Sequence, residues 1–192
     1  MPMGWLDRRL IQTADRLEKR LSVAQPAVRF VTTYSPHLFG ALFIASWYAA
    51  KRGDDETRFA IVTSVTAGTI AVALAKAISH TTHRSRPFSG PDGIAPLVEH
   101  RDDSSFPSDH SAGAVAFAVG LAGAPLWLKL PAAGLAGIVA VSRIYSKLHW
   151  PSDVLAGAAV GFAAAKVSAR IPGAVWRVTR LGVQISGVNY LR

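Results

Sequence analysis

Long stretches without a charged residue constrain this chain more than any other feature of its sequence. Three runs contain no Asp, Glu, Lys or Arg: residues 30–50, 59–75 and 111–128. A helix needs about 20 consecutive, mostly apolar residues to cross the hydrocarbon core of a bilayer. Runs of this length therefore predict membrane-spanning helices. Two shorter stretches, 130–142 and 154–165, fit the same interpretation if the flanking Arg143 and Lys166 lie inside the bundle or extend to the interface.

The chain is expected to form one all-α domain, 1–192, built as a polytopic membrane helix bundle. Its 192 residues are one domain's worth of sequence and are 50% hydrophobic. The segment 81–107 is rich in Pro and Gly and is too broken for a long helix. A catalytic bundle over 34–170 would contain about five transmembrane spans, at roughly 34–50, 58–80, 108–125, 131–146 and 151–170.

The two ends of the chain are more polar than the bundle. Residues 1–25 predict an amphipathic N-terminal helix that ends at Gln25-Pro26. Charged residues cover much of this helix. Four leucines share one stripe of it: Leu6, Leu10, Leu17 and Leu21. Such a helix either lies in the plane of the membrane interface or packs as a surface helix on the bundle. Residues 174–192 predict a basic tail that is interfacial or partly disordered.

The formal net charge of +9 limits the classes of partner that the chain is expected to bind. In a membrane protein this charge favours anionic lipid head groups and an anionic substrate. No nucleic-acid partner is expected, because the chain has no RNP, helix-turn-helix or zinc-finger pattern. The absence of cysteine from the sequence excludes disulfides, thiol chemistry and cysteine-based metal sites.

Three polar clusters punctuate the apolar pattern: Arg86-Pro87, residues 106–110, and Ser142-Arg143 with His149 and Asp153. In the last cluster the histidine follows the arginine by six residues, and the carboxylate comes four residues later. An imidazole with a carboxylate one helical turn away is an oriented base or nucleophile. Arginine side chains bind phosphate oxygens well.

A second histidine, His110, could protonate a leaving group. Together the clusters predict phosphoryl transfer through a phosphohistidine, with no obligatory metal and no cofactor. All of them fall at the ends of expected spans. Because consecutive spans alternate in direction, these ends lie on one face of the membrane and can converge.

These clusters resemble the motifs of the type 2 phosphatidic acid phosphatase family, whose site is shared with vanadium haloperoxidases. The family pattern is Lys-x6-Arg-Pro, Pro-Ser-Gly-His and Ser-Arg-x5-His-x3-Asp. The third motif matches fully over 142–153, and the second matches with Asp109 in place of the usual glycine. The resemblance covers roughly 58–170. The segment 84–110 is most similar to the bacterial undecaprenyl-diphosphatases of this family.

The first motif departs from the family pattern. Seven residues before Arg86 stands Ser79 instead of lysine, and the nearest basic residue upstream is Lys76. A lysine at the end of a long apolar run is expected to be functional or to extend to the interface. We therefore favour Lys76 as the phosphate ligand, with Arg84 as the substitute candidate.

The resemblance implies a role for each residue. His149 attacks phosphorus, Asp153 hydrogen-bonds the other ring nitrogen of His149, and His110 protonates the leaving lipid oxygen and then activates water. Four residues hold the phosphate oxygens: Lys76, Arg86, Ser108 and Arg143. The role of Asp109 stays open between tuning His110, shaping the head-group pocket and simply starting a helix.

The function expected from the resemblance is an integral-membrane lipid phosphatase that removes the terminal phosphate of a polyprenyl diphosphate, undecaprenyl diphosphate first. One alternative keeps the chemistry and changes the lipid to phosphatidic acid, phosphatidylglycerol phosphate or a polyprenyl-phosphoryl sugar phosphate. The alternative from another class is a non-catalytic lipid-binding membrane protein with a degenerate site. Expected partners are the lipid phosphate and membrane lipids.

Two further expectations concern assembly and location. Gly157 and Gly161 form a G-x-x-x-G pattern that permits close helix approach, either within the chain or in a homodimer. The resemblance places the protein in a bacterial inner membrane with the active site facing outward. The positive-inside rule agrees for the loop 51–58 and Lys129, but the basic residues of 1–25 would then lie outside.

Overall fold

The computed structural model describes residues 4–50, 55–90 and 94–170, and every regular element in these ranges is helical. The predicted all-α fold is therefore confirmed for this part of the chain. The predicted tail, 174–192, lies outside the described residues. The helices are α1 (Trp5–Arg20), α2 (Gln25–Ala50), α3 (Asp55–Thr81), α4 (Asp109–Gly120), α5 (Leu126–Tyr145) and α6 (Pro151–Ala169), with 3₁₀ turns at Ser22–Ala24 and Pro87–Ser89.

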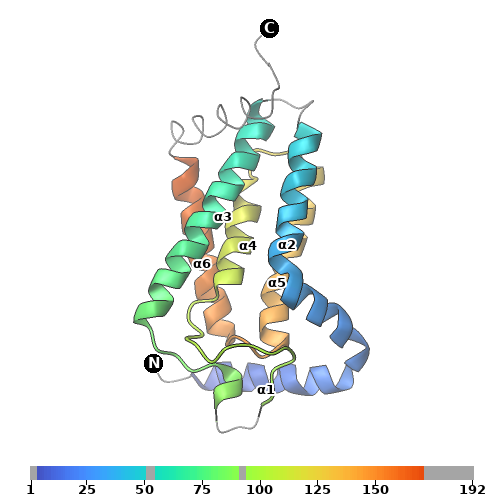
Figure 1. Cartoon of the computed structure of the whole chain (residues 1–192), viewed down its shortest axis with the longest axis vertical. Helices are drawn as coiled ribbons and strands as arrows, with labels where there is room; N and C mark the ends of the chain where they lie inside the picture. Colours follow the sequence, from blue (N-terminus) through green and yellow to red (C-terminus); the bar gives the residue numbers. More distant parts are fainter. Residues whose placement is uncertain (1–3, 51–54, 91–93, 171–192) are drawn as a thin grey trace.

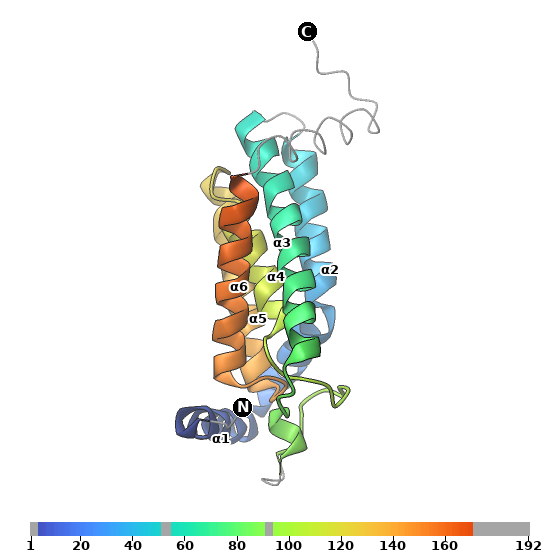
Figure 2. The ribbon, with the colours of Figure 1, turned by 90° about the vertical axis from the view of Figure 1, so that its left-hand side faces the viewer.

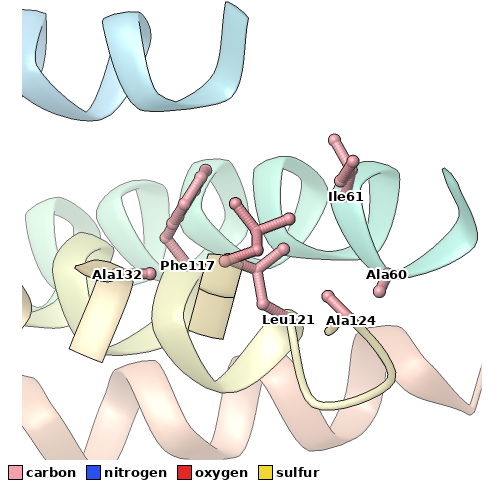
Figure 3. Close-up of a cluster of buried hydrophobic side chains, with 7 residues drawn as sticks. Ala60, Ile61, Phe117, Leu121, Ala124 and Ala132 are labelled. Atoms are coloured by element: carbon pink, nitrogen blue, oxygen red, sulfur yellow. The ribbon is translucent and has the colours of Figure 1, made fainter. Parts of the chain in front are cut away.

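The bundle is organised around the short helix α4, which lies between α3, α5 and α6 (Figure 1). Small side chains bring these helices close together, because they let backbones approach. The alanines at the contact between α3, α4 and α6 are at most 3% exposed: Ala67, Ala71, Ala75, Ala112, Ala116, Ala164 and Ala165. A second core lies where α3 and α4 meet the start of α5, around Ile61, Phe117 and Leu121 (Figure 3).

The two glycines of the G-x-x-x-G pattern are used inside the chain. A Cβ atom at Gly157 would fall against the carbonyl oxygen of Ser108, and one at Gly161 against that of Ala112. The backbone of α6 therefore rests directly on α4. Because α4 of the same chain covers this face, the intramolecular alternative is the one that the structure contains, and the homodimer stays a prediction.

Three of the helices are long and apolar enough to cross a membrane by length and composition: α3, α5 and α6. They make this an integral membrane protein. The expected span over 108–125 is too long, because α4 has 12 residues and a rise of 1.5 Å per residue makes it only about 18 Å long. The hydrocarbon core is about 30 Å thick. After Gly120 the chain turns, and Pro125 caps α5.

Prolines mark different places than the sequence suggested. Gln25 and Pro26 begin α2 instead of ending the first helix, since proline suits the first helical turn. Pro36 and Pro131 lie inside α2 and α5, where span starts were expected. Proline removes one backbone hydrogen bond and can kink a helix without ending it when neighbouring helices hold both halves. Figure 1 shows this bend in the lower half of α2.

Helix α1 lies across the end of the bundle at which α3 and α5 finish and α6 begins (Figures 1 and 2). Its buried face carries Asp7, Ile11, Ala14 and Glu18, whereas its three leucines and the C-cap Leu21 are exposed. One buried stripe therefore contacts the bundle while the leucine stripe points elsewhere. The placement of that stripe in a membrane interface stays a prediction.

Replacement of Gly161 by Ala should destabilise the bundle by about 1–3 kcal/mol, the usual cost of overpacking, because the new methyl group meets a backbone oxygen that cannot move aside. The matched control is Gly137→Ala on α5, where a Cβ meets nothing within 4 Å. Thermal unfolding in detergent should show a lower midpoint for Gly161→Ala and an unchanged or higher midpoint for Gly137→Ala. Equal midpoints for the two variants would contradict the close contact of α4 and α6.

Candidate active site

The three polar clusters meet at the end of the bundle that α1 crosses. The loop between α3 and α4 passes beneath the bundle there (Figure 2), and it carries Arg86. Arg143 lies in the last turn of α5, His149 in the connection to α6, and His110 in the first turn of α4.

A tight C-terminal turn of α5 places His149. Lys147 N–H donates to the Ile144 carbonyl at 3.0 Å and Leu148 N–H to the Arg143 carbonyl at 3.1 Å, the two bonds of a Schellman motif. Lys147 occupies the left-handed position of this motif with φ 60°, a position at which glycine is the usual residue. This turn reverses the chain just before His149.

His149 is 3% exposed, and its two ring nitrogens have different environments. Nδ1 lies 2.8 Å from the carbonyl oxygen of Ser105, which can only accept, so Nδ1 carries the proton. Nε2 therefore keeps its lone pair and lies 3.4 Å from Nη1 of Arg86. Burial, followed by the charge of Arg86, lowers the pKa of His149 to about 3. The imidazole is thus neutral at neutral pH and has the lone pair that a nucleophile needs.

Asp153 does not make the hydrogen bond expected of it. Its Oδ2 lies 3.9 Å from Nδ1 of His149 and instead accepts the backbone N–H of Trp150 at 2.9 Å, in the manner of a helix capping box. Its Oδ1 accepts from Nη1 of Arg84. The expected partner of His149 is therefore replaced by the Ser105 carbonyl, a backbone group for which the sequence holds no signal.

Arg86 and Arg143 are buried and bind backbone carbonyl oxygens. Arg86 donates from Nη1 to the Leu148 carbonyl at 2.8 Å and forms an ion pair with Asp103, a residue whose side chain is 61% exposed. Arg143 donates from Nη2 to the Thr32 carbonyl at 2.6 Å and to Oγ of Ser35 at 3.0 Å. The Nε of Arg143 is buried without a partner among the described residues. An unpaired buried donor of this kind is costly unless a ligand satisfies it.

Arg84 lies in the α3–α4 loop, yet its side chain is buried. It is 9% exposed, and both of its terminal nitrogens bind carboxylates: Nη1 that of Asp153, and Nη2 that of Asp7 at 2.6 Å. Nη1 also lies 2.7 Å from Oγ of Ser152. These contacts offset the charge of Arg84, and its Nε is buried without a hydrogen-bond partner among the described residues. The role of Arg84 as substitute phosphate ligand stays a prediction.

The start of α4 carries the second histidine and its neighbours. Ser108 is the fully buried N-cap; its Oγ lies 3.0 Å from Oγ of Ser111, and its backbone N–H donates to the Asp153 carbonyl at 3.1 Å. Oδ1 of Asp109 lies 2.7 Å from Nδ1 of His110. The carboxylate thus fixes Nδ1 as a donor and leaves Nε2 of His110 to exchange protons. This contact supports the role of orienting His110, while the place of Asp109 in the first turn of α4 and in the wall of the groove described next leaves the other two roles open.

An apolar groove of about 550 Å³ runs between α2, α3 and α4. Aromatic and aliphatic side chains line it, among them Phe39, Phe43 and Phe117. Its titratable lining residues are Lys76, Asp109 and His110; His149, Arg86 and Arg143 are not part of its wall. Lys76 and His110 therefore line the same groove. Among the described residues, no group of three His, Cys, Asp or Glu side chains could hold a metal ion.

Comparisons with known proteins agree with the three motifs. The sequence pattern described as PAP2 superfamily matches residues 57–177. The bacitracin transport permease protein BcrC of Bacillus licheniformis is 31% identical over 150 residues, which are 76% of this chain and 70% of that protein. Undecaprenyl-diphosphatase BcrC of Bacillus subtilis strain 168 is 26% identical over 134 residues, 70% of this chain and 67% of that protein.

The fold is also that of a solved structure. The crystal structure of Aquifex aeolicus LpxE superposes with a TM-score of 0.72 at 21% identity, covering 87% of this chain and 96% of that one. At this identity the likeness concerns the fold, whereas the matched pattern and the relatives above concern the family. The chain therefore belongs to the PAP2 superfamily, the family of lipid phosphatases that its three motifs resemble.

Proposed function

We propose that this chain removes the terminal phosphate of a polyprenyl diphosphate through a phosphohistidine on His149. The observation that carries the proposal is an apolar groove whose wall includes His110 and does not include His149. A lipid chain in this groove would bring its phosphate-bearing end to His110, the residue placed to protonate the lipid-side oxygen. The charged phosphate would then extend toward His149, Arg86 and Arg143.

Undecaprenyl diphosphate is the substrate that we propose first. The Bacillus subtilis relative is named as an undecaprenyl-diphosphatase, and the apolar lining of the groove suits a hydrocarbon chain. Phosphatidic acid, phosphatidylglycerol phosphate and a polyprenyl-phosphoryl sugar phosphate have the same phosphate chemistry. A panel of these lipids, assayed for phosphate release by the purified protein, separates the substrates. Release from none of them would favour the non-catalytic lipid-binding alternative.

In the first step, Nε2 of His149 attacks the terminal phosphorus as the bond to the bridging oxygen breaks. His110 gives a proton to that oxygen, and the lipid monophosphate leaves. In the second step, His110 takes a proton from a water molecule whose oxygen attacks the phosphohistidine. The phosphorus–nitrogen bond breaks, inorganic phosphate leaves, and both histidines return to their starting states.

Positive charge is the main requirement of such a transfer, because a loose phosphoryl transition state spreads negative charge over its equatorial oxygens. Arg143 is held by neutral acceptors, and the carboxylate partner of Arg86 is largely exposed to water. Both cations therefore keep charge for the phosphate. Lys76 would add a third charge from the groove side, and Ser108 would offer its hydroxyl proton. With this charge supplied by side chains, we expect a chelator to leave the rate unchanged.

Replacement of His149 by Ala should lower phosphate release by more than about 10³-fold, the scale of losing a nucleophile. The matched control is His83→Ala, an exposed histidine of the α3–α4 loop, which should retain activity. The wild-type protein, quenched during turnover of substrate labelled with ³²P in its terminal phosphate, should carry acid-labile label that the His149 variant lacks. Full activity of His149→Ala would refute the mechanism.

The groove predicts chain-length selectivity. Gly40 lines it and has open space around its Cα, so Gly40→Leu should fill the groove without a clash. We expect the KM for a long-chain polyprenyl diphosphate to rise about tenfold or more, the scale of a lost hydrophobic subsite, with little change for water-soluble isopentenyl diphosphate. The control is Gly134→Leu, in the separate groove between α2 and α5, which also has open space. A KM that responds equally to both variants would contradict this path for the lipid.

We further propose that α2 to α6 together form the membrane-embedded body in a bacterial inner membrane, with the site outside. Because the chain has no cysteine, single substitutions report orientation directly. Ala95 is exposed in the α3–α4 loop at the site end, and Ala122 is exposed in the turn after α4. In intact spheroplasts, a membrane-impermeant maleimide should label Ala95→Cys and not Ala122→Cys. The reverse pattern would place the site in the cytoplasm.

A further inference from the structure

A carboxylate from the N-terminal helix lies inside the candidate active site. Asp7 of α1 is 7% exposed. It accepts Nη2 of Arg84 at 2.6 Å, the backbone N–H of Ser152 at 3.0 Å and the Ser152 hydroxyl at 2.6 Å. Burial acts to raise the pKa of Asp7, but the bonds from Ser152 and Arg84 outweigh it and the pKa is lowered. Asp7 is therefore a buried, ionised and fully bonded group.

Arg84 joins this carboxylate to the catalytic residues. Its Nη1 binds Asp153 and Ser152 while its Nη2 binds Asp7, so one guanidinium bridges α1 and the first turn of α6. Asp153 in turn lies 3.9 Å from Nδ1 of His149, and its carbonyl accepts the N–H of Ser108 at the start of α4. Asp7 is thus linked through Arg84 to Asp153, which lies against both histidine-bearing segments.

A second pair of carboxylates on α1 holds the turn that carries His149. Nζ of Lys147 lies 3.0 Å from Glu18 and 3.3 Å from Asp15. Asp7 and Glu18 are three helical turns apart and share the buried face of α1. Each binds a cation two residues away from a site residue: Arg84 before Arg86, and Lys147 before His149. Helix α1 therefore spans the site from the α3–α4 loop to the α5–α6 connection.

Helix α1 also has an apolar attachment. Ile11 is 1% exposed and packs with Ile94 and Trp150. This contact could hold α1 in place without any buried charge, and charges are costly to bury even in pairs. The Asp7–Arg84–Asp153 cluster thus goes beyond what attachment requires, and it involves a residue outside 57–177, the part of the chain that the superfamily pattern covers.

We propose that Asp7 is a positioning residue of the active site, which acts through Arg84 and Ser152 to hold Asp153 and the first turn of α6 in register with His149. Helix α1 then belongs to the catalytic unit and is more than a membrane attachment. The proposal rests on the proposed function, since it assigns Asp7 to the same phosphatase site. A misplacement of about 1 Å in a catalytic group can cost about 10²-fold in rate.

The test compares Asp7→Asn with Ile11→Ala in the full-length protein in detergent. Asp7→Asn keeps the shape of the side chain but turns an amide toward Arg84, so kcat should fall about 10- to 100-fold while KM changes by less than about twofold. Ile11→Ala weakens the attachment of α1 and leaves the Arg84 contacts, so kcat should stay near the wild-type value. Thermal unfolding of both variants measures how much stability each has lost.

Two further variants keep the test decisive. Ser152→Ala removes a hydroxyl shared by Asp7 and Arg84 and should lower kcat in the same direction as Asp7→Asn, which covers the case in which Asp7→Asn fails to fold. Gln12→Ala changes an exposed side chain of the same helix and should leave kcat near the wild-type value. If kcat falls in proportion to the decrease in the thermal unfolding midpoint across all four variants, then α1 only stabilises the fold. That result would overturn the proposal.

Failure of this inference is distinguishable from failure of the proposed function. If the wild-type protein releases no phosphate from any lipid of the panel, the proposed function fails first. If the wild-type protein is active and Asp7→Asn matches it in kcat, only the role of Asp7 is wrong.

Discussion

The direct contact of the α6 backbone with α4 is the constraint on which the site depends. Gly157 and Gly161 let the two helices approach until carbonyl oxygens of α4 occupy the space of a side chain. This approach brings the starts of both helices together, so the Ser108 N–H can donate to the Asp153 carbonyl at 3.1 Å. His110 follows Ser108 by two residues, and Asp153 begins the helix that follows His149. The relative position of the two histidines is therefore built on packing between small residues.

Three arginines near the site have different roles because their partners differ in charge. Arg84 binds two buried carboxylates and is neutralised by them. Arg143 binds a carbonyl and a hydroxyl, which orient the guanidinium but leave its charge available. Arg86 is intermediate, since its partner Asp103 is mostly exposed and water screens that ion pair. The charge of the hydrogen-bond partners thus distinguishes arginines suited to phosphate from an arginine that organises other residues.

Several features of the fold and site could be predicted from the sequence. The predictions that were wrong have common physical causes. Uncharged runs predicted helices for α3, α5 and α6, because exclusion of charge is imposed by the membrane. The uncharged run 111–128 overestimated the length of α4. A helix enclosed by protein can be as apolar as one enclosed by lipid, but it can be much shorter. The prolines at positions 36 and 131 suggested helix starts, yet both lie within helices that neighbours hold together. Arg84 looked solvated because its two carboxylate partners are 77 and 69 residues away.

Residue types and their spacing alone established an all-helical membrane protein with two histidines, a carboxylate and a set of cations suited to phosphoryl transfer. These properties are local, since charge, polarity and motif spacing belong to the side chains themselves. The folded chain decided which partner each group has: the Ser105 carbonyl for His149, Asp109 for His110, the Thr32 carbonyl for Arg143 and Asp7 for Arg84. Most of these partners are backbone carbonyls or come from distant helices. Every residue has a carbonyl oxygen, so only the three-dimensional arrangement selects the one that is used.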